Sequence, residues 1–161
     1  MSADLHIRAG DPAEPAVRSL IATLDAQMAA LYPAESNHLL DIEALRQPHV
    51  SLLVAERAGS VSGCGAFVRH ADYVEIKRMI VAPLARGNGI GRALLAALER
   101  RARADGYALA RLETGIHQPD ALALYTRGGY QIRGPFGDYA EDPLSVFMEK
   151  RLAAEPDSAP L

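Results

Sequence analysis

The spacing of apolar positions predicts strands and helices that follow one another along the chain. Alternation of apolar and polar residues predicts strands at 5–8, 49–57, 60–70 and 73–81, with Ala58-Gly59 as a hairpin turn. Leu20, Ile21, Leu24, Met28 and Leu31 recur at helical spacing and predict the buried face of a helix. That helix is expected to begin at 12, after a capping aspartate, and a second short helix fits 40–46.

The second half of the chain predicts a long helix at 89–104, with Ile90, Leu94, Leu95 and Leu98 on one stripe and Gly106 as its left-handed end. A strand at 108–113, a helix at 119–127 and strands at 130–133 and 144–150 follow. The strand–helix–strand unit at 74–113 implies a parallel pair, whereas the hairpin implies antiparallel pairing. We therefore expect an α/β fold of the α+β type, with a mixed, mostly antiparallel sheet of about six or seven strands and helices on both faces.

Composition narrows the class of protein. The chain has 161 residues, 49% of them apolar, which suits one domain over 1–152; the polar tail 153–161 is expected to be disordered. No membrane-length apolar run and no signal peptide are expected, and Cys64, the single cysteine, reads as a buried inert thiol in a cytoplasmic protein. The net charge of −3 argues against nucleic acid as the main partner.

The most informative segment lies between the strand at 73–81 and the long helix. Gly87, Gly89 and Gly91 allow a tight turn that exposes main-chain N–H groups, and the helix that follows directs its positive dipole end to the same place. Arg86 and Arg92 add positive charge on either side. This pattern predicts a phosphate or pyrophosphate site.

Three kinds of phosphate-binding loop compete for this segment. A P-loop is a poor match, because Gly91 is followed by Arg92-Ala93 rather than by lysine and a hydroxyl residue. A dinucleotide fingerprint is weak, because its third glycine comes one residue too early, although Glu113 lies where a ribose-binding acid would sit. The pattern Arg/Gln-x-x-Gly-x-Gly/Ala matches 86–91 at every defined position.

At this loop the chain resembles the GNAT superfamily of acetyl-CoA-dependent N-acetyltransferases. The segment 75–83 looks like the family's fourth strand, and 121–130, which includes Tyr125, looks like its Ala-x-x-Leu-Tyr-x-x-x-Gly-Phe/Tyr segment. The resemblance implies that strands 73–82 and 108–113 splay apart, and that coenzyme A pairs its pantetheine arm with main chain near 79–81. The implied cofactor-binding residues are Met79, Ile80, Val81, Arg86, Gly87, Asn88, Gly89, Ile90, Gly91 and Arg92.

Acetyl transfer to an amine needs a base for the amine and an acid for the leaving thiolate, because free amines are mostly protonated at neutral pH. The resemblance implies that Tyr125 is the general acid. Glu75, on the fourth strand, and Glu113, at the end of the fifth, are alternative bases. Glu75 can instead pair with Lys77, since residues i and i+2 of a strand point to the same side.

Substrate contacts are assigned from position. Ser36 and His38 lie in the loop between the first two helices, which shapes the acceptor pocket in the family, and Tyr139 lies in the loop before the last strand. By alternation, one of Lys77 and Arg78 is expected to face the pocket, where it can hold a substrate carboxylate. The five histidines show no metal-ligand spacing, so we expect no metal.

The sequence thus predicts an enzyme that moves an acetyl group from acetyl-CoA directly to a small primary amine, with a carboxylate on the amine as one option. Two other classes stay open: a module that binds acyl-CoA without turnover, and an enzyme that uses a nicotinamide dinucleotide. Pairing of edge strands between two copies would give a homodimer, which the sequence allows but does not demonstrate.

Overall fold

A computed structural model describes residues 5–37 and 40–152, and in this part of the chain one seven-stranded sheet has the order β1-β2-β3-β4-β5-β7-β6. The strands are β1 (Leu5–Ala9), β2 (Val50–Arg57), β3 (Ser60–Arg69), β4 (Val74–Val81), β5 (Leu109–Gly115), β6 (Gln131–Arg133) and β7 (Ser145–Arg151). The helices are α1 (Pro15–Leu31), α2 (Ile42–Leu45), α3 (Ile90–Ala104) and α4 (Pro119–Arg127), with short 3-10 segments η2 (Ala34–Ser36) and η3 (Pro83–Ala85).

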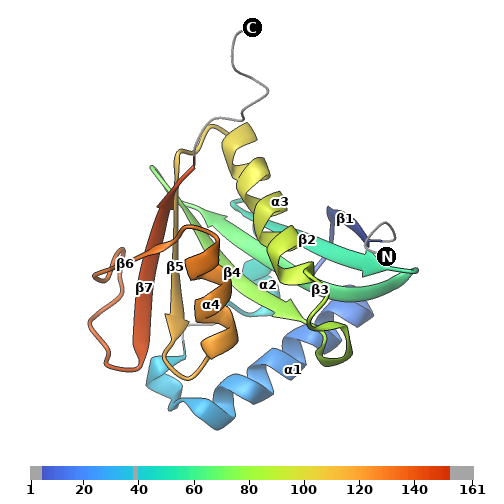
Figure 1. The fold of residues 1–161 in the computed structure, drawn as a ribbon, viewed down its shortest axis with the longest axis horizontal. Helices are drawn as coiled ribbons and strands as arrows, with labels where there is room; N and C mark the ends of the chain where they lie inside the picture. Colours follow the sequence, from blue (N-terminus) through green and yellow to red (C-terminus); the bar gives the residue numbers. More distant parts are fainter. Residues whose placement is uncertain (1–4, 38–39, 153–161) are drawn as a thin grey trace, which may run out of the picture.

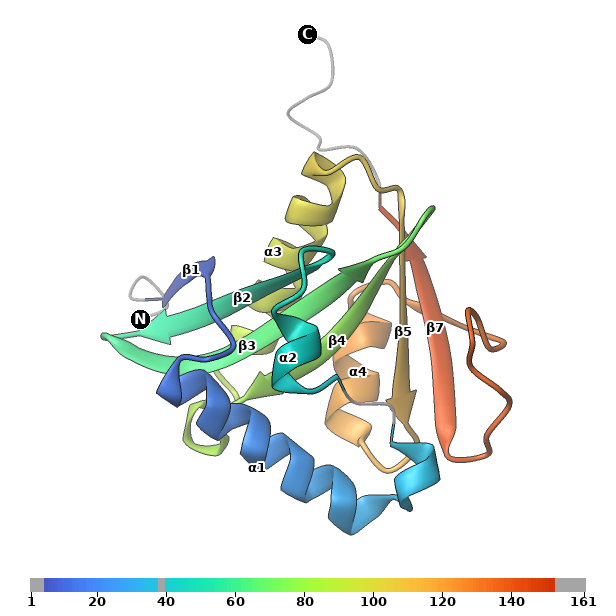
Figure 2. The ribbon, with the colours of Figure 1, turned by 180° about the vertical axis from the view of Figure 1, so that it is seen from behind.

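The pairing of the strands follows from their connections. β1 to β4 and β5 to β7 to β6 pair antiparallel, whereas β4 and β5, which are joined through α3, are parallel. Figure 1 shows α3 and α4 on one face of the sheet, and Figure 2 shows α1 and α2 on the other. The predicted mixed, mostly antiparallel sheet with helices on both faces is confirmed.

Two hydrophobic layers hold the helices to the sheet. Leu94 and Leu98 of α3 are fully buried against one face, and Ile21 and Met28 of α1 are buried against the other. The four predicted core positions of the long helix are all buried, as are the first four of the five predicted in α1. The expectation for Leu31 is wrong: its side chain is 43% exposed, because α1 ends there and the extended backbone at Tyr32 turns the tyrosine inward instead.

The predicted start of α1 at position 12 is also wrong, since the helix begins at Pro15. Proline disfavours a helical backbone conformation at the residue before it, and Glu14 accordingly has a ψ of 133°. Asp11 still shapes the approach to the helix, because its side chain accepts a hydrogen bond from the N–H of Ala13 at 2.9 Å. The proline occupies the first helical position, where its missing N–H has no cost.

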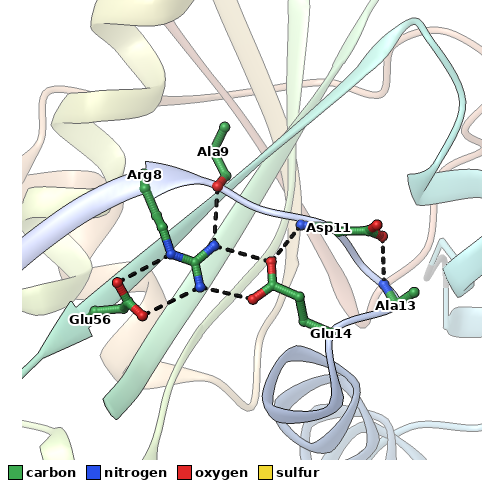
Figure 3. Close-up of polar contacts among 6 residues, drawn as sticks. All are labelled: Arg8, Ala9, Asp11, Ala13, Glu14 and Glu56. Carbon is green, nitrogen blue, oxygen red and sulfur yellow. Dashed lines mark hydrogen bonds and ion pairs between the residues drawn. The ribbon is translucent and has the colours of Figure 1, made fainter. Parts of the chain in front are cut away.

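Arg8 ties this approach to the sheet (Figure 3). Its guanidinium contacts Glu14 at 2.8 Å and Glu56 of β2 at 3.2 Å, and Glu14 also accepts a hydrogen bond from the N–H of Asp11 at 2.8 Å. The bonds from Arg8 and from the Asp11 main chain lower the pKa of Glu14 from 4.5 to about 2. A single arginine therefore fastens β1, β2 and the beginning of α1 to one another.

This network predicts an acid-dependent part of the stability. Because the folded-state pKa of Glu14 is depressed, the contribution of Glu14 to the free energy of unfolding is complete above pH 4.5 and is lost as the pH falls toward 2. The side chain is 30% exposed, so we expect Glu14→Gln to lower the free energy of unfolding at pH 7 by only about 1 kcal/mol. Thermal unfolding of both proteins between pH 7 and 2 checks this: the two curves should converge at low pH. Glu43→Gln, in an exposed pair with Arg46, is the control, and equal effects of the two variants would refute the assignment.

The remaining expectations concern the single cysteine, membrane spans, metal ligands and the tail. Cys64 is fully buried in β3, and burial raises the pKa of its thiol to about 12, which suits an inert thiol. None of the helices in the described part of the chain has the length and hydropathy to cross a bilayer, and no cluster of three possible metal ligands occurs there. The expectations for His38 and for the tail 153–161 lie outside the described residues.

Candidate functional site

The site begins where β4 and β5 separate. The two strands pair only at three positions, from Val74 with Ala110 to Ile76 with Leu112. Beyond Ile76 they diverge, and Figure 1 shows their C-terminal ends apart. In the described structure the main-chain groups of β4 on this side therefore have no partner strand after Ile76, and they are available to a ligand.

A β-bulge lies in β4 just beyond the point where β4 and β5 separate. Ala66 pairs with Lys77 and Cys64 with Ile80, so that Arg78 and Met79 together lie opposite Gly65 alone. Arg78 adopts a φ of +58°, an unusual conformation for a residue other than glycine. A Cβ added at Gly65 would lie 2.4 Å from the sulfur of Met79, so a larger residue here would force the methionine side chain to move. The bulge also interrupts the alternation of side chains along β4.

The glycine loop lies at the end of β4 and leads into α3. Gly89 precedes the first helical residue with a φ of +77°, and no side chain caps the helix. The first N–H groups of a helix have no intrahelical partner, so the loop presents them to solvent together with the helix dipole. Asn88 donates a hydrogen bond to the carbonyl of Ala85 at 3.0 Å and so holds the loop. This geometry suits an anion, as the sequence predicts.

The loop opens on a large cavity of about 880 Å³ between β4, α1 and α4. Nine of the ten predicted cofactor-binding residues line this cavity, and Asn88 is the exception. Its lining residues are Leu24, Gln27, Met28, Ala30, Leu31, Met79, Ile80, Val81, Arg86, Gly87, Gly89, Ile90, Gly91, Arg92, His117, Gln118, Pro119, Asp120, Ala121, Ala123, Leu124, Tyr125 and Arg127. The five residues from α1 were missed, because only the topology brings α1 to this place.

A second, small cavity of about 80 Å³ adjoins the first on the side of the loop after α1. Its lining residues are Leu24, Met28, Tyr32, Ser36, Asn37, Ile76, Lys77, Arg78, Met79, Glu113, Thr114, Gly115, Gln118, Ala121, Tyr125 and Leu144. Leu24, Met28, Met79, Gln118, Ala121 and Tyr125 line both cavities. The two spaces thus meet beside the bulge of β4 and the tyrosine of α4.

Tyr125 has the properties of a proton donor at this junction. It is buried, and in the described part of the chain no group forms a hydrogen bond with its hydroxyl. Burial, and secondly the charge of Glu113, raise the pKa of Tyr125, so the hydroxyl keeps its proton at neutral pH. The end of α4 fixes its position, since the N–H of Tyr130 donates to the Tyr125 carbonyl at 3.0 Å. Tyr130 itself is a core residue.

The two candidate bases occupy different surroundings. Glu113 lines the small cavity and accepts a hydrogen bond from the Ser145 hydroxyl at 2.8 Å. Glu75 is buried behind the cavity wall, where the hydroxyl of Tyr139 donates to it and His70 and Lys77 lie at 3.3 and 3.4 Å. The carboxylate of Glu75 therefore organises its neighbours, whereas that of Glu113 faces the cavity.

Lys77 and Arg78 both line the small cavity, since the bulge removes the alternation that would have sent only one of them there. The ammonium of Lys77 lies 2.7 Å from the Tyr139 hydroxyl, which places Tyr139 behind it rather than in the lining. Arg78 donates to Asp25 of α1 at 2.5 Å and to the carbonyl of Leu40 at 2.7 Å.

The loop after α1 covers the small cavity. The hydroxyl of Ser36 donates to Asp142 of the β6–β7 loop at 2.6 Å. The Tyr32 hydroxyl accepts the N–H of His117 at 3.0 Å, and its ring fills the space where a side chain on Gly115 would lie. The resemblance implies that the loop 32–38 shapes the acceptor pocket, but sequence reasoning assigned no role to the side chain of Tyr32, because the helical spacing placed Leu31 in the core.

Comparison with known proteins agrees with this geometry. Residues 17–130 match the sequence model of the Acetyltransferase (GNAT) family. An IAA acetyltransferase from Azospirillum brasilense is 52% identical over 143 residues, which make up 88% of this chain and 94% of that protein. The crystal structure of a proposed acyl-CoA N-acyltransferase from Klebsiella pneumoniae is 42% identical, with a TM-score of 0.80 over 94% of this chain and 99% of that one.

A structure of YncA from Salmonella typhimurium, which holds its cofactor acetyl-CoA, has a TM-score of 0.69 over 95% of this chain and 96% of that one. At 23% identity it shows that the fold is shared.

Proposed function

The chain belongs to the acetyltransferase (GNAT) family and is an acyltransferase, and we propose that it moves the acetyl group of acetyl-CoA directly to the primary amine of a small molecule. The observation that carries this proposal is the junction of the two cavities. The large one has an anion-binding loop at one end, the small one has room for a few atoms, and Tyr125 and Met79 line both.

The residues of the large cavity fit coenzyme A. Main-chain N–H groups at 87–91, with Arg86 and Arg92, suit its pyrophosphate, and the unpaired edge of β4 suits its peptide-like arm. Acetyl-CoA supplies the activated acetyl group. We assign the stabilisation of the negative charge that develops on the carbonyl oxygen to main-chain N–H groups of β4 beyond Ile76, where β4 has no partner strand on the side of β5 in the described structure.

The small cavity supplies the acid–base chemistry. Glu113 accepts the proton that the amine must lose before or during attack, and Tyr125 gives its proton to the leaving sulfur. Glu75, which lies behind the lining of the small cavity, contacts Lys77 and Tyr139 and holds both in place. Lys77 is the cation that we assign to a carboxylate on the acceptor, with Ser36 as a neighbouring hydrogen-bond donor.

Calorimetry with acetyl-CoA, and with NADH as control, tests the donor. We expect micromolar binding of acetyl-CoA and none of NADH. Release of free thiol from acetyl-CoA then tests the acceptor with three amines: β-alanine, 2-aminoethylphosphonate and propylamine. Turnover of the two anionic amines well above that of propylamine supports the assignment of Lys77, and failure to bind acetyl-CoA would refute the proposal.

Two glutamine variants separate the roles of the carboxylates. Glu113→Gln should lower kcat and remove the acidic limb of its pH profile, because the cavity then lacks its base. Glu75→Gln should retain that limb and mainly raise KM for the amine, because it loosens Lys77 and Tyr139. The reverse pattern would assign the base to Glu75.

A further inference from the structure

Arg78 is an unusual residue to find at the bulge of β4. Its side chain is 3% exposed, and its backbone lies in the left-handed region, which a long side chain seldom adopts. A buried guanidinium is costly unless its donors are satisfied. Two of its nitrogens have partners within the protein: Nη1 donates to Asp25 of α1, and Nε donates to the carbonyl of Leu40.

The first of these contacts fixes α1. Asp25 lies between Leu24 and Met28, the two residues of α1 that line both cavities. A bond from Arg78 to Asp25 therefore sets how far α1 lies from β4 and how it is rotated. Leu24 and Met28 then form one wall of the junction.

The second contact fixes the chain that follows α1. Leu40 precedes α2 and ends the segment that contributes Ser36 and Asn37 to the small cavity. The N–H group of Arg78 that bonds the Leu40 carbonyl at 2.7 Å anchors this end of the segment, while Ser36 anchors its middle to Asp142. Figure 2 shows α1 and α2 on the same face of the sheet, which agrees with the contacts of Arg78 with Asp25 and Leu40.

We propose that Arg78 is a positioning residue for the acceptor amine: through Asp25 and Leu40 it sets the wall of the small cavity that α1 and the segment after it provide. The inference rests on the proposed function of that cavity. It assigns Arg78 to cavity shape rather than to contact with a substrate carboxylate, which leaves Lys77 for that contact. Neither bond touches the glycine loop, so the site assigned to the pyrophosphate is kept. Because α1 also lines the large cavity, we expect an effect on acetyl-CoA that is smaller than the effect on the amine.

The exposure of Asp25 keeps the effect of an Arg78 substitution local. The Asp25 side chain is 48% exposed, so water can solvate its carboxylate when the arginine is removed. Arg78→Met keeps an unbranched apolar stem and a side chain at the positive φ, and it removes both hydrogen bonds. We expect it to raise KM for the fastest amine of the three above by about tenfold, and KM for acetyl-CoA by less than about twofold. Arg78→Lys, which keeps the charge, should recover part of the loss.

Lys150→Met is the matched control. Lys150 of β7 pairs with the buried Glu99 of α3 at 2.8 Å, and neither residue lines a cavity. This variant should lower the melting temperature and leave both KM values unchanged. Equal rises of the two KM values in Arg78→Met, or a loss of melting temperature with no change in KM, would overturn the proposal.

A second measurement does not need turnover. Hydrogen exchange of the full chain saturated with acetyl-CoA should be faster at residues 24–37 in Arg78→Met, and unchanged there in Lys150→Met. Unchanged exchange at 24–37 in Arg78→Met would overturn the positioning role. If none of the three amines is acetylated while exchange changes as expected, the choice of acceptor has failed and the positioning role stands.

Discussion

Replacing Tyr125 by phenylalanine is expected to lower kcat by about 100- to 1000-fold, the usual contribution of a positioned general acid. The change removes one oxygen and keeps the ring that packs edge-on against Tyr130 with its centroid at 5.8 Å. The hydroxyl has no hydrogen-bond partner in the described structure, so its loss leaves no buried group unpaired. Steady-state thiol release measures kcat, and calorimetry should show acetyl-CoA affinity within about twofold of the parent.

Tyr130→Phe is the matched control for this experiment. Its hydroxyl donates to the buried Glu99 at 2.9 Å, so removing it should lower the melting temperature, with little effect on kcat. The raised pKa of Tyr125 adds a pH criterion. Because the hydroxyl keeps its proton through neutral and mildly alkaline pH, kcat of the parent should show no alkaline loss below pH 9 from this group. Equal kcat for Tyr125→Phe and the parent would remove Tyr125 from the mechanism.

The parts of the site that the sequence predicts are those built from neighbouring residues. The glycine loop, the strand before it and the helix that carries Tyr125 each have a local pattern, and the structure places all of them along the cavities. Leu24 and Met28 reach both cavities from α1, and Tyr32, the residue after α1, reaches the small one; no local pattern reveals this. Their contribution depends on how a distant helix packs against the open edge of β4.

Errors of the sequence analysis also have local physical causes. Position 12 is a good first residue for a helix, but Pro15 imposes an extended conformation on Glu14 and delays the start. Alternation predicts that one of Lys77 and Arg78 faces the pocket, and the bulge opposite Gly65 brings both there. A bulge places one extra residue in one strand, and here Arg78 and Met79 lie opposite Gly65, a register that depends on pairing with β3 and that alternation along β4 does not reveal.

The second large effect concerns the loop itself: Gly89→Val is expected to weaken acetyl-CoA binding by about 10- to 100-fold, from a backbone penalty of roughly 1–3 kcal/mol. Space is not the cause, since an added Cβ would meet nothing within 4 Å. The cause is the φ of +77°, which a β-branched residue avoids. The variant loop therefore moves away from the conformation that directs its N–H groups to one anion.

Gly106→Val separates this effect on binding from a general loss of stability. Gly106 lies just beyond the other end of α3 with a φ of +93°, and its added Cβ would also meet nothing within 4 Å. Both variants carry a similar backbone penalty, so both should lower the melting temperature by a similar amount. Calorimetry with acetyl-CoA should distinguish them, because of the two glycines only Gly89 belongs to the proposed anion site. If the two variants bound acetyl-CoA equally well, the glycine at 89 would serve folding alone. The pyrophosphate would then have to be held by the arginine side chains.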